Sequence, residues 1–327
     1  MLAASEITSL HWGGFVVIIL LLLALDLGVF HRESRVVRFR EAIAWSFVWF
    51  ALSMGFAAGL ASWRGRSEAI EFVTGYVVEL SLSMDNVFVI ALIFSYFAVP
   101  LEHQHRVLFW GILGALIMRG LMIGLGAALI QTFSWMLYVF GAFLVVTGIK
   151  MLFSHQEEVH PEKNLLIRLA CRFFPVSPRL EGDKFWTRID GRAALTPLAL
   201  VLLMVETTDL IFAVDSIPAI FAVTQKSFVV FTSNIFAILG LRSLYFVLAN
   251  AIGCFRYLKY GLSSVLVFIG LRMVLDPHRT EGSAGAGPAE RHWFQVEIPT
   301  TISLLVVLGL ILFSIGASMV VGKQQKS

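Results

Sequence analysis

Long apolar stretches without charge alternate with short polar segments along this chain of 327 residues. Two of the clearest, Ala42–Trp63 and Ile298–Gly322, exceed the roughly 20 residues that a helix needs to cross a bilayer. The pattern predicts an all-α polytopic membrane protein with about nine transmembrane helices. The predicted spans are Trp12–Phe30, Ala42–Trp63, Phe72–Val99, Val107–Ile130, Phe133–Lys150, Ala193–Val223, Phe228–Phe255, Tyr257–Leu275 and Ile298–Gly322.

Composition supports a membrane protein and argues against a large soluble core. Charged residues make up 14% of the chain, against roughly 25% in soluble domains, and apolar residues make up 58%. The two cysteines, Cys171 and Cys254, have no metal-like spacing and suggest no disulfide framework. No basic residue precedes the first apolar run, so we expect this run to be a retained helix.

The distribution of lysine and arginine predicts the orientation in the membrane. With the N-terminus outside, the inner segments hold 17 of the 25 basic residues and the outer segments hold five. We therefore expect a bacterial inner-membrane protein with a periplasmic N-terminus and a cytoplasmic C-terminus. In this orientation Ser154–Arg192 is a charged cytoplasmic loop, and Thr280–Glu290 is a flexible outer tether.

The same acidic signature occurs twice within the apolar spans. Glu79 precedes Asp85 by six residues, and Asp209 precedes Asp215 by the same spacing. A charged side chain at the centre of a bilayer costs about 2.5–3.5 kcal/mol on insertion scales, and such residues commonly line an ion or proton path. The repeated spacing predicts a cation pathway built from two copies of one unit.

Other motifs extend this repeat. Gly148–Met151 resembles Gly270–Met273, and both follow their acidic spans in the same order. The two copies cover residues 72–150 and 193–275, each with three helices, so the second copy enters the membrane from the opposite side. The alternative is that apolar helices resemble one another by composition alone.

A count of charges separates structural from functional roles. The spans contain six acids against two deep bases, Arg119 and Arg242. Structural ion pairs can account for about two of the acids, and protons or metal ions must neutralise the rest. Oxygen ligands, without thiolates or histidines in the spans, favour Mg²⁺, Ca²⁺ or Mn²⁺. The six acids are Asp26, Glu79, Asp85, Glu206, Asp209 and Asp215.

Helix geometry restricts how these acids can meet one ion. Six residues turn a helix by about 240°, so Glu79 and Asp85 cannot share a face, whereas Glu79, Ser83 and Asn86 can. Either the helix breaks, or it lies between two walls of the site. Pro218 favours a break in the second copy, because it leaves the carbonyl of Val214 without its helical donor.

Two further groups have weaker signals. Asp26 and His31 fit a solvated boundary at the inner end of the first helix better than a transport site. The tract His155–Glu162 could hold a metal transiently, but its spacing matches no closed metal motif and favours ordinary loop charges.

Several segments together resemble the TerC family of integral membrane proteins. They are Asp26–His31, Glu79–Phe88, Phe94–Phe97, Tyr138–Phe143, Glu206–Ala219 and Ser233–Arg242. The family is named for tellurium resistance. The resemblance implies a manganese exporter, since better-understood bacterial members are of this kind and others are linked to loading metal into secreted proteins. It also implies a metal path lined by Glu79, Asp85, Asn86, Glu206, Asp209 and Asp215.

The leading hypothesis is export of a divalent cation, with manganese as the expected ion, by exchange for protons. Exporting a divalent ion against an inside-negative potential costs about 4.6 kcal/mol per 100 mV, and exchange for two protons moves no net charge. We expect the bilayer, the cation and protons as partners, no tightly bound cofactor, no nucleic acid and no enzymatic activity. One alternative is a membrane-embedded partner that hands metal to other proteins. Another is an intramembrane aspartyl protease, but Asp85 and Asp215 lack the Gly-x-Gly-Asp context of that class.

Overall fold

The computed structural model describes residues 7–30, 39–133, 135–153, 164–189, 191–249, 258–275 and 298–324. This part of the chain forms ten helices and one two-stranded hairpin. The helices are α1 (Ser9–Phe30), α2 (Phe39–Trp63), α3 (Arg66–Tyr96), α4 (Leu101–Thr132), α5 (Met136–Phe153), α6 (Leu165–Phe173), α7 (Pro197–Val223), α8 (Ser227–Ala249), α9 (Leu258–Leu275) and α10 (Thr300–Gln324). The strands are β1 (Trp186–Ile189) and β2 (Arg192–Leu195).

Each predicted span overlaps one of the nine long helices, and most ends agree within a few residues. Seven of the described helices are long and apolar enough to cross a membrane, which confirms a polytopic membrane protein. The fully described apolar part of α1, Ser9–Ala24, is shorter. The count of nine crossings therefore stays a prediction.

The sixth span begins later than predicted. The residues from Arg192 to Leu195 form β2, and α7 begins at Pro197. The side chain of Thr196 caps the helix by accepting from the backbone N–H of Ala199, and proline is well suited to the first helical position.

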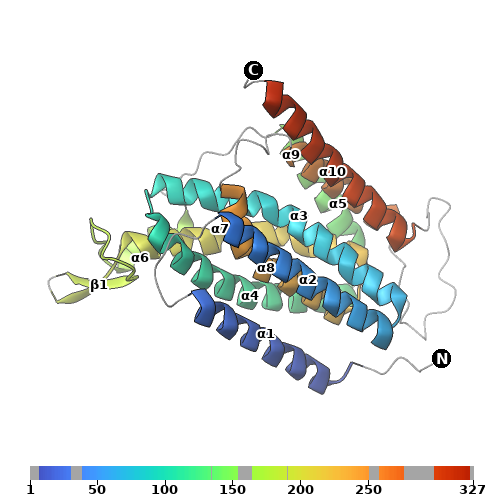
Figure 1. The fold of residues 1–327 in the computed structure, drawn as a ribbon, viewed down its shortest axis with the longest axis horizontal. Coiled ribbons are helices and arrows are strands. Elements are labelled where there is room, and N and C mark those ends of the chain that lie inside the picture. The colour runs from blue at the N-terminus through green and yellow to red at the C-terminus, as the bar shows by residue number, and fades with distance from the viewer. Residues whose placement is uncertain are drawn as a thin grey trace.

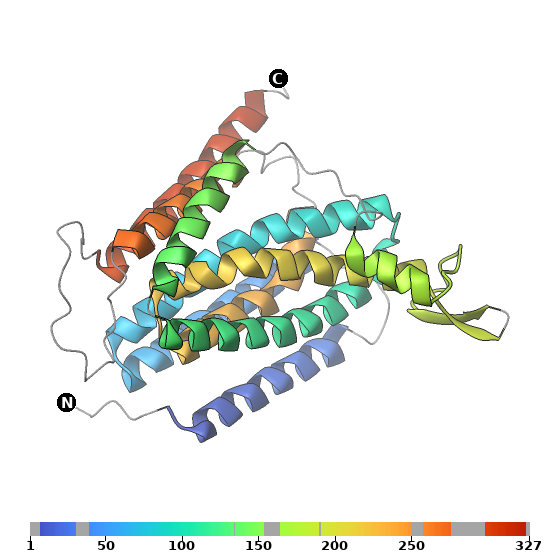
Figure 2. The same cartoon turned by 180° about the vertical axis from the view of Figure 1, so that it is seen from behind.

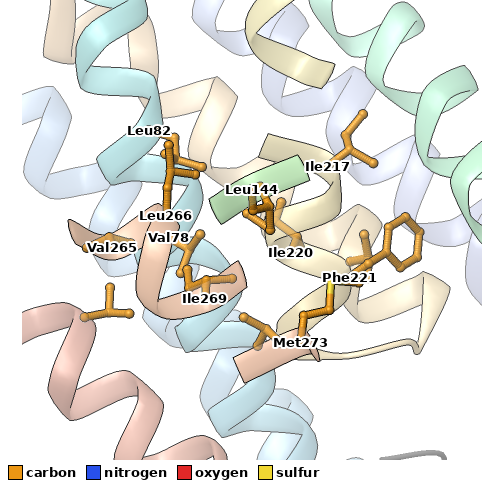
Figure 3. Close-up of a cluster of buried hydrophobic side chains, with 14 of the residues drawn as sticks. Val78, Leu82, Leu144, Ile217, Ile220, Phe221, Val265, Leu266, Ile269 and Met273 are labelled. Carbon is orange, nitrogen blue, oxygen red and sulfur yellow. The ribbon is translucent and has the colours of Figure 1, made fainter. Parts of the chain in front are cut away.

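Eight of the nine long helices form two groups, and α1 lies outside both (Figures 1 and 2). In the first, α3, α4, α7 and α8 pack against one another, with α2 against α3 and α8. In the second, α5, α9 and α10 lean together across the bundle and contact α3 and α7. A cluster of buried side chains joins the groups (Figure 3). It includes Val78, Leu82, Leu144, Ile217, Ile220, Phe221, Val265, Leu266, Ile269 and Met273.

Small residues bring α5 and α9 into close contact. A Cβ atom on Gly270 would lie 2.7 Å from the carbonyl oxygen of Gly141. A Cβ atom on Gly148 would lie 3.0 Å from the carbonyl oxygen of Ser263, whose hydroxyl donates to the Gly148 carbonyl. The two helices are antiparallel and approach closely at both positions, as small residues allow within membranes.

This close approach predicts a large difference between two glycine substitutions. Gly270→Ala places its methyl group against backbone atoms, and overpacking of this kind typically costs about 1–3 kcal/mol. Gly309→Ala on α10 meets no atom within 4 Å and should change stability little. Thermal unfolding of both variants in the same detergent measures the difference. Equal stability of the two variants would contradict the close α5–α9 contact.

The segment predicted as a charged loop contains ordered elements. Asn164 caps α6 by accepting from the N–H groups of Leu166 and Ile167, and β1 pairs with β2 in an antiparallel hairpin. Gly191 in the hairpin turn has a φ of +79°, a conformation that glycine adopts without steric cost. The segment expected as a charged cytoplasmic loop therefore contains one short helix, at residues 165–173, and the first strand of a hairpin, at residues 186–189.

Candidate functional site

A buried arginine connects the first acids of the two repeated signatures. Arg119 lies on α4 and is fully buried. Its guanidinium forms an ion pair with Glu79 on α3, and its Nη2 lies 3.0 Å from Oδ1 of Asp209 on α7. Arg119 Nε also donates to the second Asp209 oxygen at 3.3 Å. Three helices thus meet at one cluster of charges.

Polar side chains complete this cluster. Ser83 donates to Glu79 at 3.1 Å, and Asn86 Nδ2 donates to Asp209 Oδ1 at 3.2 Å. Arg119 Nη1, which contacts Glu79, also donates to the Ser216 hydroxyl at 3.2 Å. Glu79, Ser83 and Asn86 lie on one face of α3, as their spacing predicts. We call the six residues Glu79, Ser83, Asn86, Arg119, Asp209 and Ser216 the arginine core.

The arginine core has unused capacity for a cation. It contains two carboxyl groups and one guanidinium, so it carries a net negative charge when both acids are ionised. Glu79 Oε2 and Asn86 Oδ1 are buried and have no hydrogen-bond partner among the described residues. Buried acceptors without a donor are costly, and both oxygens suit a hard cation or a proton.

Glu206 lies beside the core on α7. Its carboxylate packs against α4, because a Cβ atom on Gly114 would lie 2.0 Å from Glu206 Oε1. Glu206 is one helical turn before Asp209, and the two charges interact. Any larger residue at position 114 would require the Glu206 carboxylate to move away from the α4 backbone.

Asp85 and Asp215 face different neighbours from the core acids. Asp85 interacts electrostatically with Lys259 on α9. Asp215 interacts with Thr147 and Lys150, both on α5. Each of these acids therefore lies toward the α5–α9 pair, while Glu79 and Asp209 lie toward α4. Sequence reasoning did not identify Lys150, Thr147 or Lys259 as neighbours of the acids.

The sequence leaves two arrangements open for the acids of one helix, a broken helix or a continuous helix between two walls of the site. Both α3 and α7 are continuous helices in the structure, and Pro218 lies inside α7 without dividing it. The predicted break is therefore not seen, and each helix lies between two walls. One wall is α4 with Arg119, and the other is the α5–α9 pair.

The six predicted site residues do not form one metal centre in this conformation. Within the described residues, no three His, Cys, Asp or Glu side chains come together closely enough to hold a metal ion. Glu79, Asn86 and Asp209 meet in the arginine core, Glu206 lies next to it, and Asp85 and Asp215 lie apart. The side chain of Asp26, His31 and the tract His155–Glu162 lie outside the described residues.

A second charged network lies at the N-terminal end of α3. Lys226 Nζ lies 3.3 Å from Glu71 and 3.5 Å from Glu68, and Glu68 also pairs with Arg64. Thr224 donates to Glu71 at 2.7 Å. The network links the turn before α3 and the first turns of α3 to the turn between α7 and α8. Its acids already have partners and are not expected to hold a metal.

Comparison with known proteins identifies the chain. The sequence profile of the "Integral membrane protein TerC family" matches residues 64–326. The chain belongs to the TerC family. This TerC-family protein is 48% identical over 309 residues to an uncharacterized membrane protein of Myxococcus xanthus, covering 94% of this chain and 92% of the relative. It is 43% identical over 316 residues to an Escherichia coli K12 protein named as a candidate membrane-bound redox modulator, Alx, covering 94% and 93%.

More distant relatives match over the same length. A membrane protein of Rickettsia bellii is 39% identical over 311 residues, covering 95% of the TerC-family chain and 97% of the relative. No solved structure matches this chain. The arginine core lies within the residues that the family profile covers.

Proposed function

We propose that this TerC-family protein exports a divalent metal cation, with manganese as the substrate, in exchange for protons through the arginine core. The observation that carries the proposal is the pair of buried carboxyl groups, Glu79 and Asp209, held by the single guanidinium of Arg119. Two carboxylates, an amide oxygen and two hydroxyls form an all-oxygen donor set, which fits a hard cation such as Mn²⁺.

Arg119 acts in this proposal as a resident cation. Its guanidinium neutralises part of the core charge while no metal is bound, which reduces the cost of two acids in an apolar environment. An entering divalent ion competes with the guanidinium for the same carboxylate oxygens. After the metal has left, protons bind the acids for the return step. The carboxyl groups are therefore neutralised in every step, either by the metal or by protons together with the guanidinium.

The proposed inverted repeat supports alternating access. The helices that the sequence alignment relates are α3 with α7, α4 with α8, and α5 with α9. Gly148 and Gly270 correspond in the two copies, and each lies at one of the two close approaches between α5 and α9. The contacts of α3 with α8 have a counterpart in those of α7 with α4. If the two copies are related by an axis in the membrane plane, each contact between the copies must have a counterpart. The two glycine contacts and the two helix pairs fit this requirement.

The outlying acids extend the proposed path. Asp85 and Asp215 are six residues from the core acids, about 9 Å along their helices. Because α3 and α7 run antiparallel, Asp85 lies near the depth of Asp209, and Asp215 lies near the depth of Glu79. We propose that each exchanges the ion or proton with the core acid at its own depth, on the side of the α5–α9 pair. The N-terminus outside and the C-terminus in the cytoplasm complete the proposed topology.

Metal flux in vesicles tests this function. We expect purified protein in liposomes with a pH gradient to move Mn²⁺ against its gradient, with proton movement in the opposite direction. Protein-free liposomes and liposomes without a pH gradient are the controls. Ca²⁺ and Zn²⁺ measured in parallel establish the selectivity. Metal binding without flux would instead support the alternative of a partner that hands metal to other proteins.

A further inference from the structure

A distinct amphipathic surface projects from one end of the bundle, beyond the beginning of α7 (Figures 1 and 2). It consists of α6 and the β1–β2 hairpin, and we call it the α6–hairpin surface. Its large apolar side chains are exposed, with Leu165 at 74%, Phe173 at 69% and Trp186 at 53% of their full exposure. Exposure of so many large apolar side chains to water is unfavourable, and a patch of this kind commonly marks a site that contacts a membrane or another protein.

The apolar and basic residues of α6 are separated around the helix. Leu165, Leu169 and Phe173 follow one another at four-residue spacing, which places them on one face. Arg168 and Arg172 form the adjacent stripe. Ile167, on the side away from this face, is buried where α6 packs on α7. Short helices with this separation lie at the boundary between lipid headgroups and acyl chains.

The hairpin adds a basic pocket to the same surface. The pocket is open, has a volume of about 490 Å³ and is lined by Lys184, Trp186, Thr187, Arg188 and Ala193. The rings of Phe174 and Trp186 meet edge to face at 5.2 Å, which joins the end of α6 to the hairpin. Residues 164–195 contain six basic and three acidic side chains, so this end of the protein attracts anions.

Several contacts fix the surface beside the membrane-spanning helices. Arg106 at the start of α4 pairs with Asp183, and its guanidinium lies 5.3 Å from the ring centre of Phe185. Thr196, immediately before α7, donates to the Lys184 carbonyl at 2.6 Å. The Asn164 side chain donates to Met204 on α7 at 3.2 Å. The pocket therefore has a fixed position relative to α4 and α7.

We propose that the α6–hairpin surface lies in the headgroup layer and that its pocket binds the phosphate of an anionic phospholipid. Lys184 and Arg188 supply the positive charge, and Trp186 has the amphipathic ring that is enriched at membrane interfaces. The apolar face of α6 reaches toward the acyl chains. The proposal is independent of metal transport, since none of these residues belongs to the arginine core.

A spin label on α6 tests the position of the surface. Leu169→Cys is labelled in full-length protein that carries Cys171→Ser and Cys254→Ser, in nanodiscs of phosphatidylcholine with or without phosphatidylglycerol. We expect the label to be more accessible to oxygen than to a water-soluble nickel complex, and phosphatidylglycerol to strengthen this difference. A label that stays in water with both lipids would overturn the proposal. Broadening between two labels would also overturn it, because it would show that a second copy covers this face.

Lipid retention tests the pocket. The ratio of phosphatidylglycerol to phosphatidylcholine retained by the purified protein should fall about fivefold for each cation removed by Lys184→Gln or Arg188→Gln. Arg66→Gln at the start of α3 removes an exposed cation away from this surface and is the matched control. An unchanged ratio in both pocket variants, or an equal fall in the control, would overturn the pocket assignment.

Discussion

Replacement of Arg119 by glutamine is expected to destabilise the protein strongly. The change leaves Glu79 and Asp209 buried without their common counterion, and loss of one partner from a buried ion pair typically costs about 3–5 kcal/mol. Glutamine keeps much of the side-chain volume, so the effect reports mainly on charge. Thermal unfolding in detergent measures it. Arg66→Gln, which removes an exposed arginine, should leave stability nearly unchanged.

Arg119→Gln also distinguishes two roles of this arginine, a cation that the metal replaces during transport and a purely structural counterion. If the metal occupies the place of the guanidinium, Mn²⁺ should raise the unfolding temperature of Arg119→Gln more than that of the unmodified protein. Potassium chloride at equal ionic strength controls for general effects of salt. A purely structural arginine predicts the same loss of stability, but no greater response of the variant to Mn²⁺.

Asp209→Asn is expected to abolish proton-coupled metal flux. The asparagine keeps the size of the side chain but cannot supply a negative charge to the metal or release a proton at this position. Asp209 contacts both Arg119 and Asn86, so it lies at the junction of α3, α4 and α7. We expect at least a hundredfold lower initial rate in liposomes, which corresponds to about 2.7 kcal/mol.

The control for Asp209→Asn is Glu102→Gln, which removes an exposed carboxylate at the start of α4. Its flux should stay within twofold of that of the unmodified protein. Equal amounts of folded protein in the liposomes must be verified for both variants. Normal flux with Asp209→Asn would exclude this acid from the transport path.

Much of the fold follows from the apolar pattern, because long uncharged runs have few alternatives in a membrane. The charged network within the bundle could be predicted only in part. Helix periodicity places Glu79 and Asn86 on one face of α3, but no local signal connects Glu79 with Arg119, 40 residues later, or Arg119 with Asp209, 90 residues later. Such contacts depend on how the helices pack.

The positions of Asp85 and Asp215 illustrate the same limit. Their spacing correctly predicts that they face away from the core acids, but not that α5 and α9 lie against them. Pro218 suggests a broken helix, yet α7 continues through it because surrounding helices can support a proline within a membrane bundle. The α6–hairpin segment was missed because a nine-residue helix and two four-residue strands are too short for a clear periodic signal.

Equilibrium binding of Mn²⁺ to purified protein tests the central claim most directly. The account predicts one saturable Mn²⁺ site per chain in the unmodified protein and in Glu102→Gln, and loss of this site in Asp209→Asn and in Glu79→Gln. Folded protein in both core variants, verified by thermal unfolding, makes this loss specific to the site. Retention of the site with unchanged affinity in both core variants would contradict the account, because it would place the metal away from the arginine core.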